Sequence, residues 1–231
     1  MPDNWTLETP DVIINPYRFA SSGGPPTINY EGYKSNASNL STYTFTLVPI
    51  GTESGRDAVI IQAGGRGTGD ITSVTIGGTS ATEMGKEDGN GDSQGFYYLE
   101  GVTGTTTTVV VTCDAKMSRL LCSAWSASDI ASYTPYDTAS VAVLNSSANF
   151  SLSGIDSPTG DSVALVGVQC RDGGVVYSGT AGFTERLDTS VEFLCYSVGD
   201  TTFSGSGTYG ATFNPNAGGS ADQTALAIVL Q

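Results

Sequence analysis

The residue types available for catalysis are limited, because the chain contains no histidine. This excludes Ser-His-Asp and Cys-His nucleophilic systems and every zinc site that needs a His ligand. Carboxylate chemistry remains, and glycoside hydrolysis needs two carboxylates across one cleft. Some glucanases place Glu-x-Asp-x-x-Glu on a strand, and the nearest stretch here, Glu83 to Asp88, does not match that pattern. We therefore predict a protein that is not an enzyme, with no catalytic residues and no cofactor.

The stretch from Asp88 to Asp92, Asp-Gly-Asn-Gly-Asp, begins like a calcium-binding loop, in which alternate side-chain oxygens converge on the ion. The match ends there. Ser93 stands where the loop needs its turn glycine, and Leu99 stands where it needs a bidentate Glu. We expect an acidic hairpin tip without a metal at residues 87–92, and calcium binding is the alternative.

The glycine-rich run from Gly64 to Gly69 has the composition of a phosphate-binding loop but matches neither of the two known spacings, and no helix follows it. We interpret it as a turn. Arg66 in this run and Arg171 in a later segment stand at equivalent strand ends, so they either line a shared anionic site or pair with local acids.

Several tyrosines are candidates for a sugar-stacking surface, although alternation along strands predicts that about half of them face a core. They are Tyr97, Tyr98, Tyr177, Tyr196 and Tyr209.

The sequence that contains these candidates has an internal repeat. The segment from Phe45 to Arg66 has a second version that starts at Phe150, at an offset of 150 − 45 = 105 residues. At that offset Leu47 aligns with Leu152 and Ile50 aligns with Ile155. The last residue of the sequence, Gln231, aligns with Ser126. We therefore predict repeat halves at residues 40–126 and 145–231, joined by residues 127–144.

The halves consist of short segments with the alternation of β-strands, separated by glycine-rich turns, and no window shows a sustained helical period. We predict an all-β fold, a jelly-roll-like antiparallel β-sandwich built from the two repeated halves at residues 40–231. A single sandwich is the preferred arrangement, because strands such as Ala58 to Ile61 lack a polar face and indicate a core larger than one half supplies. Two small tandem sandwiches are the alternative.

Residues 1–39 differ from the rest, since they hold most of the prolines, which exclude a long helix and a central strand. We expect an extended N-terminal arm that docks on its own domain or on a neighbouring subunit. Its apolar anchors, which we expect to make assembly contacts, include Trp5, Ile13, Ile14, Tyr17 and Phe19.

The formal net charge is −14, and no basic stripe is present, so we expect no nucleic-acid partner and no anionic membrane surface. No apolar run reaches the length of a membrane helix, and the N-terminus lacks the features of a signal peptide. The four cysteines lie in strand-like runs without a Cys-x-x-Cys pair, which indicates small buried hydrophobes with reduced thiols: Cys113, Cys122, Cys170 and Cys195.

Four strings in the first half resemble a β-sandwich module that many marine bacteriophages encode among their virion genes. They are TYTFTLVPIGTESGRDAVIIQAGGRG, ITSVTIGGTSATEM, GVTGTTTTVVVT and RLLCSAWSASD. The resemblance covers residues 40–130 and, more loosely, the second half, and it consists of strand and turn residues without a catalytic motif. It implies a jelly-roll-like structural protein of the virion that decorates the head or belongs to the tail.

From this resemblance we expect a capsid decoration or cement protein on the head exterior, assembled in the host cytoplasm and located in the virion. Its partners would be the major capsid protein or other virion proteins, and the protein itself would be a homo-oligomer such as a trimer. The alternative is a carbohydrate-binding adhesin or tail-fibre module.

Overall fold

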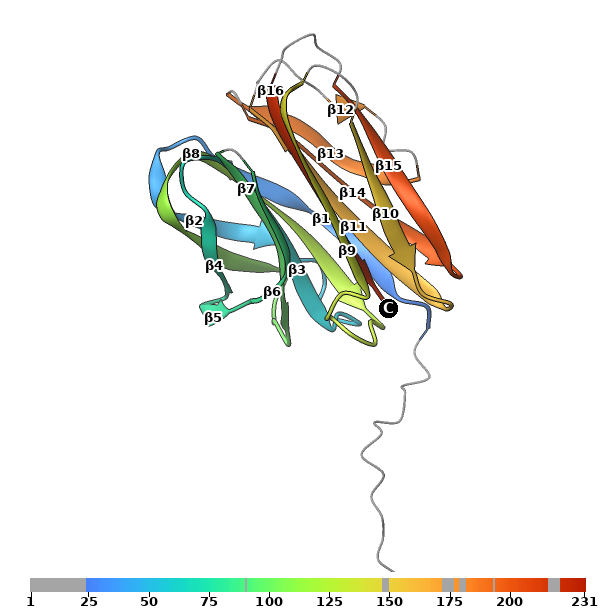
Figure 1. Cartoon of the computed structure of the whole chain (residues 1–231). Helices are drawn as coiled ribbons and strands as arrows, with labels where there is room; N and C mark the ends of the chain where they lie inside the picture. The colour runs from blue at the N-terminus through green and yellow to red at the C-terminus, as the bar shows by residue number, and fades with distance from the viewer. Residues whose placement is uncertain are drawn as a thin grey trace, which may run out of the picture.

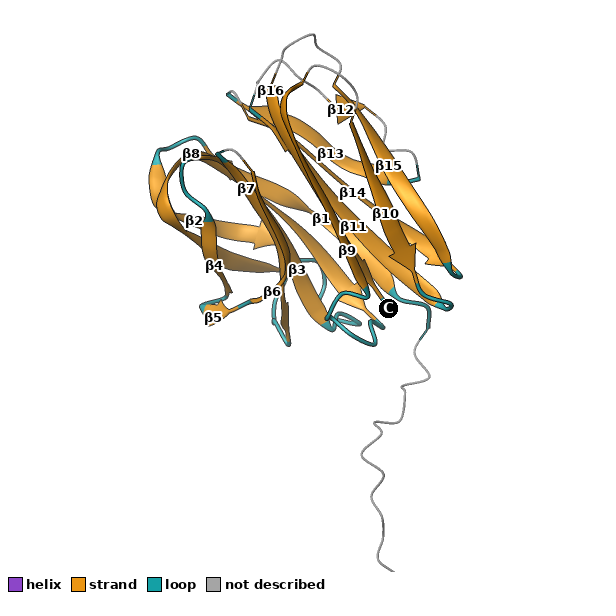
Figure 2. Cartoon of the chain, in the orientation of Figure 1, coloured by secondary structure: helices purple, strands orange, loops and turns teal. Residues whose placement is uncertain are grey.

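The computed structural model describes the chain from residue 24 onward, with short gaps: residues 24–89, 91–146, 150–171, 177–178, 182–192, 194–215 and 221–231. These residues form antiparallel strands and no helix, as Figure 2 shows, which confirms the predicted all-β fold. Within these ranges there is consequently no helix of the length and hydropathy needed to cross a membrane.

Each half of the chain contributes one series of strands. The first half contains β1 (Thr27–Asn36), β2 (Leu40–Pro49), β3 (Ala58–Gly67), β4 (Ile71–Ile76), β5 (Thr79–Ser80), β6 (Thr82–Gly89), β7 (Asp92–Glu100) and β8 (Thr106–Ser128). The second half contains β9 (Asp137–Ser146), β10 (Phe150–Ser157), β11 (Asp161–Cys170), β12 (Tyr177–Ser178), β13 (Thr184–Val191), β14 (Leu194–Ser204), β15 (Gly207–Pro215) and β16 (Ala221–Leu230).

The long strand β8 folds the first half into two layers. Its first part, up to Cys113, pairs with β4 and most of β2, whereas its second part, from Met117, pairs with β1, β3 and the first residue of β2. The two layers enclose a core of the half's own, which includes Phe45, Ile61 and Val111. The alternation of apolar and polar residues in β2 is explained by this arrangement, because only one face of β2 meets that core.

The glycine-rich run is explained by the bend of β8. A Cβ atom on Gly69 would lie 2.3 Å from the carbonyl oxygen of Ala115, and one on Gly67 would lie 2.5 Å from the Cα of Met117. Only glycine permits this close approach of two backbones. The prediction of a turn at Gly64 to Gly69 was wrong for its first part, since β3 continues to Gly67.

The second half repeats the two layers, with the sheet β13-β14-β11-β16-β9 packed on the sheet β10-β15-β12. Leu152, Val166 and Ala227 belong to the core between them. A third core joins the halves and includes Ile60 and Trp125. Figure 1 shows the first half, in blue to green, beside the second half, in yellow to red.

The two inner sheets have the same strand order. One runs β1-β8-β3-β7-β6, and the other runs β9-β16-β11-β14-β13. Across the shared core β3 faces β11, β1 touches β13, and β6 touches β9 and β16. Since β1 corresponds to β9 and β6 to β13, the halves are related by a pseudo-twofold axis along the strands.

The prediction of a jelly-roll-like antiparallel sandwich built from two repeated halves is confirmed, and the core larger than one half is present between the inner sheets. The two arrangements that the sequence left open are combined, because each half also has its own two-layer core.

The boundaries of the repeat differ from those predicted. Residues 27–36, assigned to the arm, form β1, and residues 137–146, mostly assigned to the connection at 127–144, form β9. The pairings correspond at the predicted offset, since Gly32 pairs with Ala124 and Asp137 pairs with Val229. The repeat therefore begins earlier, and the described part of the arm docks on its own domain as a strand.

The offset of 105 does not hold in every strand. Leu47 is the extra residue of a bulge in β2, with φ 53° and 67% of its surface exposed, while Leu152 is buried. The bulge residue of β10 is Gly154, so the structural offset there is 154 − 47 = 107. A shift of two residues keeps every side chain on the same face, which is why the apolar pattern did not reveal it.

We expect that β1 is required for folding. Deletion of residues 2–39 removes Ile28 and Tyr30, and the latter packs edge-on against Trp125 with ring centroids 5.4 Å apart. The deletion should lower the free energy of unfolding by at least about 3 kcal/mol. Deletion of residues 2–23 is the comparison, because it shortens the chain but keeps β1. Circular dichroism melts compare the two, and equal melting temperatures would contradict the role of β1.

Candidate functional site

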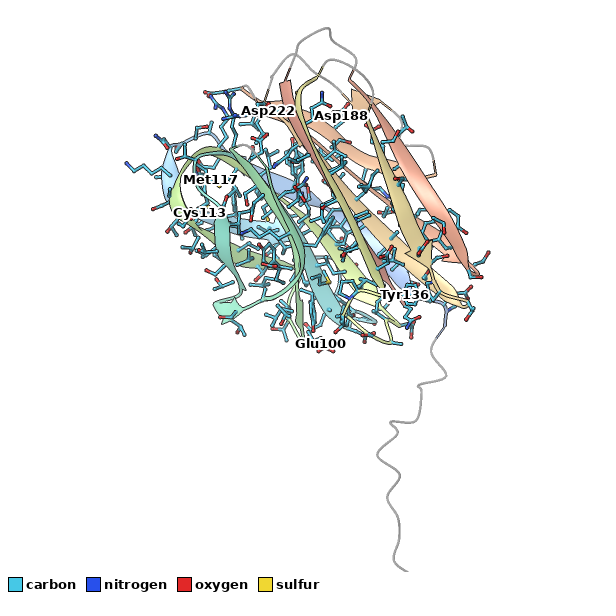
Figure 3. All side chains as sticks on the ribbon, in the orientation of Figure 1. Glu100, Cys113, Met117, Tyr136, Asp188 and Asp222 are labelled. Atoms are coloured by element: carbon cyan, nitrogen blue, oxygen red, sulfur yellow. The ribbon has the colours of Figure 1, made fainter. Side chains whose placement is uncertain are left out.

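The interface between the two inner sheets, which we call the seam, brings together the two arginines that the sequence singled out. Arg66 Nη1 donates a hydrogen bond to the carbonyl oxygen of Arg171 at 2.9 Å, across the interface between the halves. Arg171 Nη1 in turn pairs with Asp222 Oδ2 at 2.9 Å. Arg171 therefore pairs with a local acid, which is one of the two readings that the sequence left open, whereas the bond from Arg66 goes to a backbone carbonyl oxygen; Asp222 is labelled in Figure 3.

Asp92 is the second acid of this cluster, and it comes from the other half. Its side chain is buried, and Oδ1 lies 3.8 Å from Arg171 Nε. Neither carboxyl oxygen accepts a hydrogen bond from the described residues. A distance of 3.8 Å is too long for a hydrogen bond, so Arg171 offsets only part of the cost of burying this group.

The electrostatic consequence is an acid that holds its proton. Burial raises the pKa of Asp92 from 3.8 to about 8, although Arg171 and Arg66 act in the opposite direction. Asp92 therefore behaves at neutral pH largely as a neutral group at the contact between the halves.

A second polar contact between the halves lies within the shared core. Trp125 Nε1 of the first half donates to Asp200 Oδ2 of the second half at 3.1 Å. Arg186 binds the same carboxylate with two hydrogen bonds of 2.9 and 2.7 Å. Asp200 thus has charge-assisted partners on both of its oxygens, and it fixes the position of the largest side chain in the seam.

Glutamines and glycines interlock in the middle of the seam. A Cβ atom on Gly167 would lie 2.5 Å from Gln62 Nε2, and a Cβ atom on Gly64 would lie 2.7 Å from Gln169 Oε1. Each half thus places a glutamine over a glycine of the other. Gln94 accepts from Gln62 at 3.0 Å and donates to Thr224 of the second half at 3.1 Å.

The acidic hairpin is formed as expected, with Gly89 paired to Asp92 at its tip. Asp88 pairs with Lys86 Nζ at 2.7 Å and accepts from Ser93 Oγ at 2.6 Å, while Asp92 turns toward Arg171. The two carboxylates therefore have different partners. Asn90 lies outside the described residues, and the described part of the chain holds no group of three or more Cys, Asp and Glu side chains arranged for a metal.

The tyrosines whose side chains the structure describes do not form one platform. Tyr97 and Tyr196 are buried, and Tyr98 stacks on Tyr133 with ring centroids 4.7 Å apart. Tyr209, which is 37% exposed, stacks on Phe203. The side chain of Tyr177 lies outside the described part of the structure, as do the predicted assembly contacts Trp5, Ile13, Ile14, Tyr17 and Phe19.

A cleft of about 480 Å³ opens where β1, the loop from β2 to β3 and the end of β8 meet. Glu31 lies in it and accepts a hydrogen bond from Ser126 at 2.6 Å. The other lining residues include Asn29, Arg56 and the hydroxyl-bearing Thr52 and Ser54. Sequence reasoning missed this cleft, because its residues come from segments about 100 positions apart with no shared motif.

The outer layer of the first half presents a surface that we call the threonine face. Its residues alternate with core residues along β2, β4, β5 and β8, and they are Thr42, Thr44, Thr46, Ser73, Thr75, Ser80, Thr108, Val110 and Thr112. They stand in rows across the strands, with Thr42 beside Thr112 and Ser73, and Thr44 beside Val110 and Thr75. None of these nine residues carries a charge.

No protein-family description matches the chain, and no curated protein matches it. Solved structures with some likeness include a cupin 2 conserved barrel domain protein from Leptotrichia buccalis, at 13% identity, with 90% of this chain and 91% of that chain covered and a TM-score of 0.24. Another is the major capsid protein P2 from bacteriophage PM2, at 11% identity, with 89% and 98% covered and a TM-score of 0.24. At these values neither likeness bears on the function of this chain.

The buried acid leads to a prediction about pH. Because the folded-state pKa of Asp92 is raised above its unfolded value, its contribution to stability is complete below about pH 4 and is lost as the pH rises through about 8. Asp92→Asn cannot ionise. The free energy of unfolding of this variant, relative to the native chain, should therefore increase by at least about 2 kcal/mol between pH 4 and pH 9.

Urea unfolding at the two pH values measures this difference. Asp161→Asn is the matched control, because Asp161 is exposed at the start of β11, and its effect should stay within about 0.5 kcal/mol at both pH values. A pH-independent difference for Asp92→Asn would show that the carboxyl group is ionised in the folded protein.

Proposed function

We propose that this chain is a non-enzymatic structural protein of a bacteriophage particle, specifically a decoration or cement protein on the exterior of the head. Its partners are the major capsid protein and other copies of itself, in a homo-oligomer such as a trimer. The threonine face is the observation that carries this proposal, and the resemblance of residues 40–130 to virion modules of marine phages supports it.

The threonine face is suited to contact with another protein. The chain carries a net charge of −14, so two copies, or a copy and an acidic shell, repel each other wherever their charged surfaces approach. Within its nine residues the threonine face presents hydroxyl and methyl groups without a charge, which lowers that repulsion there; the exposed Asp114 continues the row of β8 beyond Thr112. Charged residues are likewise depleted at the centres of known protein interfaces.

The outer layer also holds this face in a fixed shape. Tyr43, Phe45 and Val109 alternate with its threonines and are buried in the core beneath it. The hydroxyl of Tyr43 further lies within hydrogen-bonding distance of the carbonyl oxygens of Met117 and, at 2.7 Å, Ser38, either of which can accept its one proton. A face whose residues are ordered before contact loses little conformational entropy on binding.

Charged substitutions on the threonine face test the proposal. Thr44→Glu with Thr112→Glu, and Thr44→Lys with Thr112→Lys, should each abolish incorporation into particles assembled with the major capsid protein of the same genome. The reason is that a dry contact cannot accommodate an unpaired charge of either sign. The expected loss of affinity is at least 30-fold, about 2 kcal/mol.

The control carries the same charges on β13, at the exposed positions Thr184 and Ser190, and should be incorporated normally. Melting temperatures of all variants establish that they are folded. Normal incorporation of both Thr44 and Thr112 double variants would refute the role of this face, and loss with one sign of charge only would indicate long-range electrostatics instead of contact.

The cleft at Glu31 favours a second candidate function, a carbohydrate-binding module of an adhesin or tail fibre. Its volume of about 480 Å³ is within the usual range for small-ligand sites. A carboxylate, an amide and several hydroxyls match the donors and acceptors of a neutral sugar. An acidic chain disfavours an anionic one.

Calorimetric titration with a panel of neutral monosaccharides checks this candidate. Glu31→Gln should weaken any binding at least tenfold, because a charged acceptor becomes a neutral amide. Glu83→Gln, at an exposed position of β6, should leave binding unchanged. Flat titrations with the native chain across the panel would eliminate a monosaccharide site in the cleft.

A further inference from the structure

Two cysteines of the second half are placed side by side. Cys170 of β11 and Cys195 of β14 are direct partners in the antiparallel ladder between these strands. Both are fully buried, and both side chains belong to the same core, together with Val168 and Phe203. Two sulfur atoms from positions 195 − 170 = 25 residues apart therefore occupy neighbouring places on one face of the sheet.

The geometry of the ladder is compatible with a bond between them. Direct partners in antiparallel strands have Cα atoms about 4.5 Å or about 5.5 Å apart, depending on the type of pair. Disulfides span Cα separations of about 4.4 to 6.8 Å. Both types of pair fall within this range, and the chain as described contains no disulfide at these positions.

We propose that Cys170 and Cys195 form a cross-strand disulfide when the chain encounters a hydroperoxide. The inference concerns the second half alone and does not depend on the proposed function. For a virion protein made in a reducing cytoplasm, such a pair would change state after release into an oxidising medium.

The chemistry balances with one peroxide. The sulfur of one cysteine attacks a peroxide oxygen, the O–O bond breaks, and a sulfenic acid and one water result. The sulfur of the second cysteine then attacks the sulfenic sulfur, the S–S bond forms, and the hydroxyl leaves with the second thiol proton as water. Two thiols are oxidised, and hydrogen peroxide is reduced to two molecules of water.

The other two cysteines serve as an internal comparison. Cys113 pairs with Ile71, and Cys122 pairs with Lys34 and Ala63, so neither has a cysteine opposite it. All four cysteines are buried, so the comparison rests on this register: Cys113 and Cys122 lack a second sulfur across the strand that could capture a sulfenic acid. We expect both to remain thiols under conditions that link Cys170 to Cys195.

The test treats the purified full-length chain with hydrogen peroxide, alkylates the remaining thiols in denaturant and maps the peptides by mass spectrometry. The expected product is a Cys170–Cys195 linked peptide that dithiothreitol releases. The link closes a loop of the unfolded chain, so the melting temperature should rise by about 5 °C or more and return on reduction.

Cys195→Ser and Cys195→Ala should lose both the link and the rise in melting temperature, and the alanine variant keeps the position apolar in case serine prevents folding. The double variant Cys113→Ser with Cys122→Ala should retain both effects. The proposal is overturned if peroxide leaves Cys170 and Cys195 fully alkylated, or if it converts them to sulfinic acids without a link.

Discussion

The structure depends on the burial of both faces of its two inner sheets. In β3, Val59 and Ile61 enter the core of the first half, while Ala58 and Ile60 enter the core that the halves share. The same division occurs in β11, with Val166 on one side and Leu165 on the other. A half by itself would expose the second face of such strands to water, and two-sided burial removes that cost. Three stacked cores are the result.

The buried seam must also accommodate polar groups. Asp200 accepts hydrogen bonds from Trp125 and Arg186. Each of the two glutamines that lie over a glycine of the other half fits where the opposite strand has no side chain. These contacts are specific in position, whereas apolar contacts alone tolerate sliding of one sheet over the other. Asp92 is the exception, since its neutralisation rather than its pairing makes burial possible. The seam thus fixes the register of the halves and leaves the outer faces for other roles.

Those outer faces are where an assembly function would lie. The inner sheets and their side chains are committed to packing, and the threonine face and the cleft at Glu31 are features that packing does not require. A rigid, uncharged face on an acidic molecule suits a protein that covers a larger structure. This assignment was not available from motifs, because the nine residues of the face come from four strands and acquire a common orientation only in the folded sheet.

The sequence by itself determined the β class, the repeat and the excess of buried apolar surface, because each depends on local alternation, a constant offset or composition. It also determined that Arg66 and Arg171 occupy equivalent strand ends. Only the tertiary structure decided that these arginines meet, that Gly67 and Gly69 serve the bend of β8, and that Cys170 faces Cys195. The two-residue shift at Leu47 and Gly154 was likewise invisible, since period-two alternation is unchanged by an even shift. Contacts between distant strands depend on register, and register is set by bulges and close backbone approaches that composition does not encode.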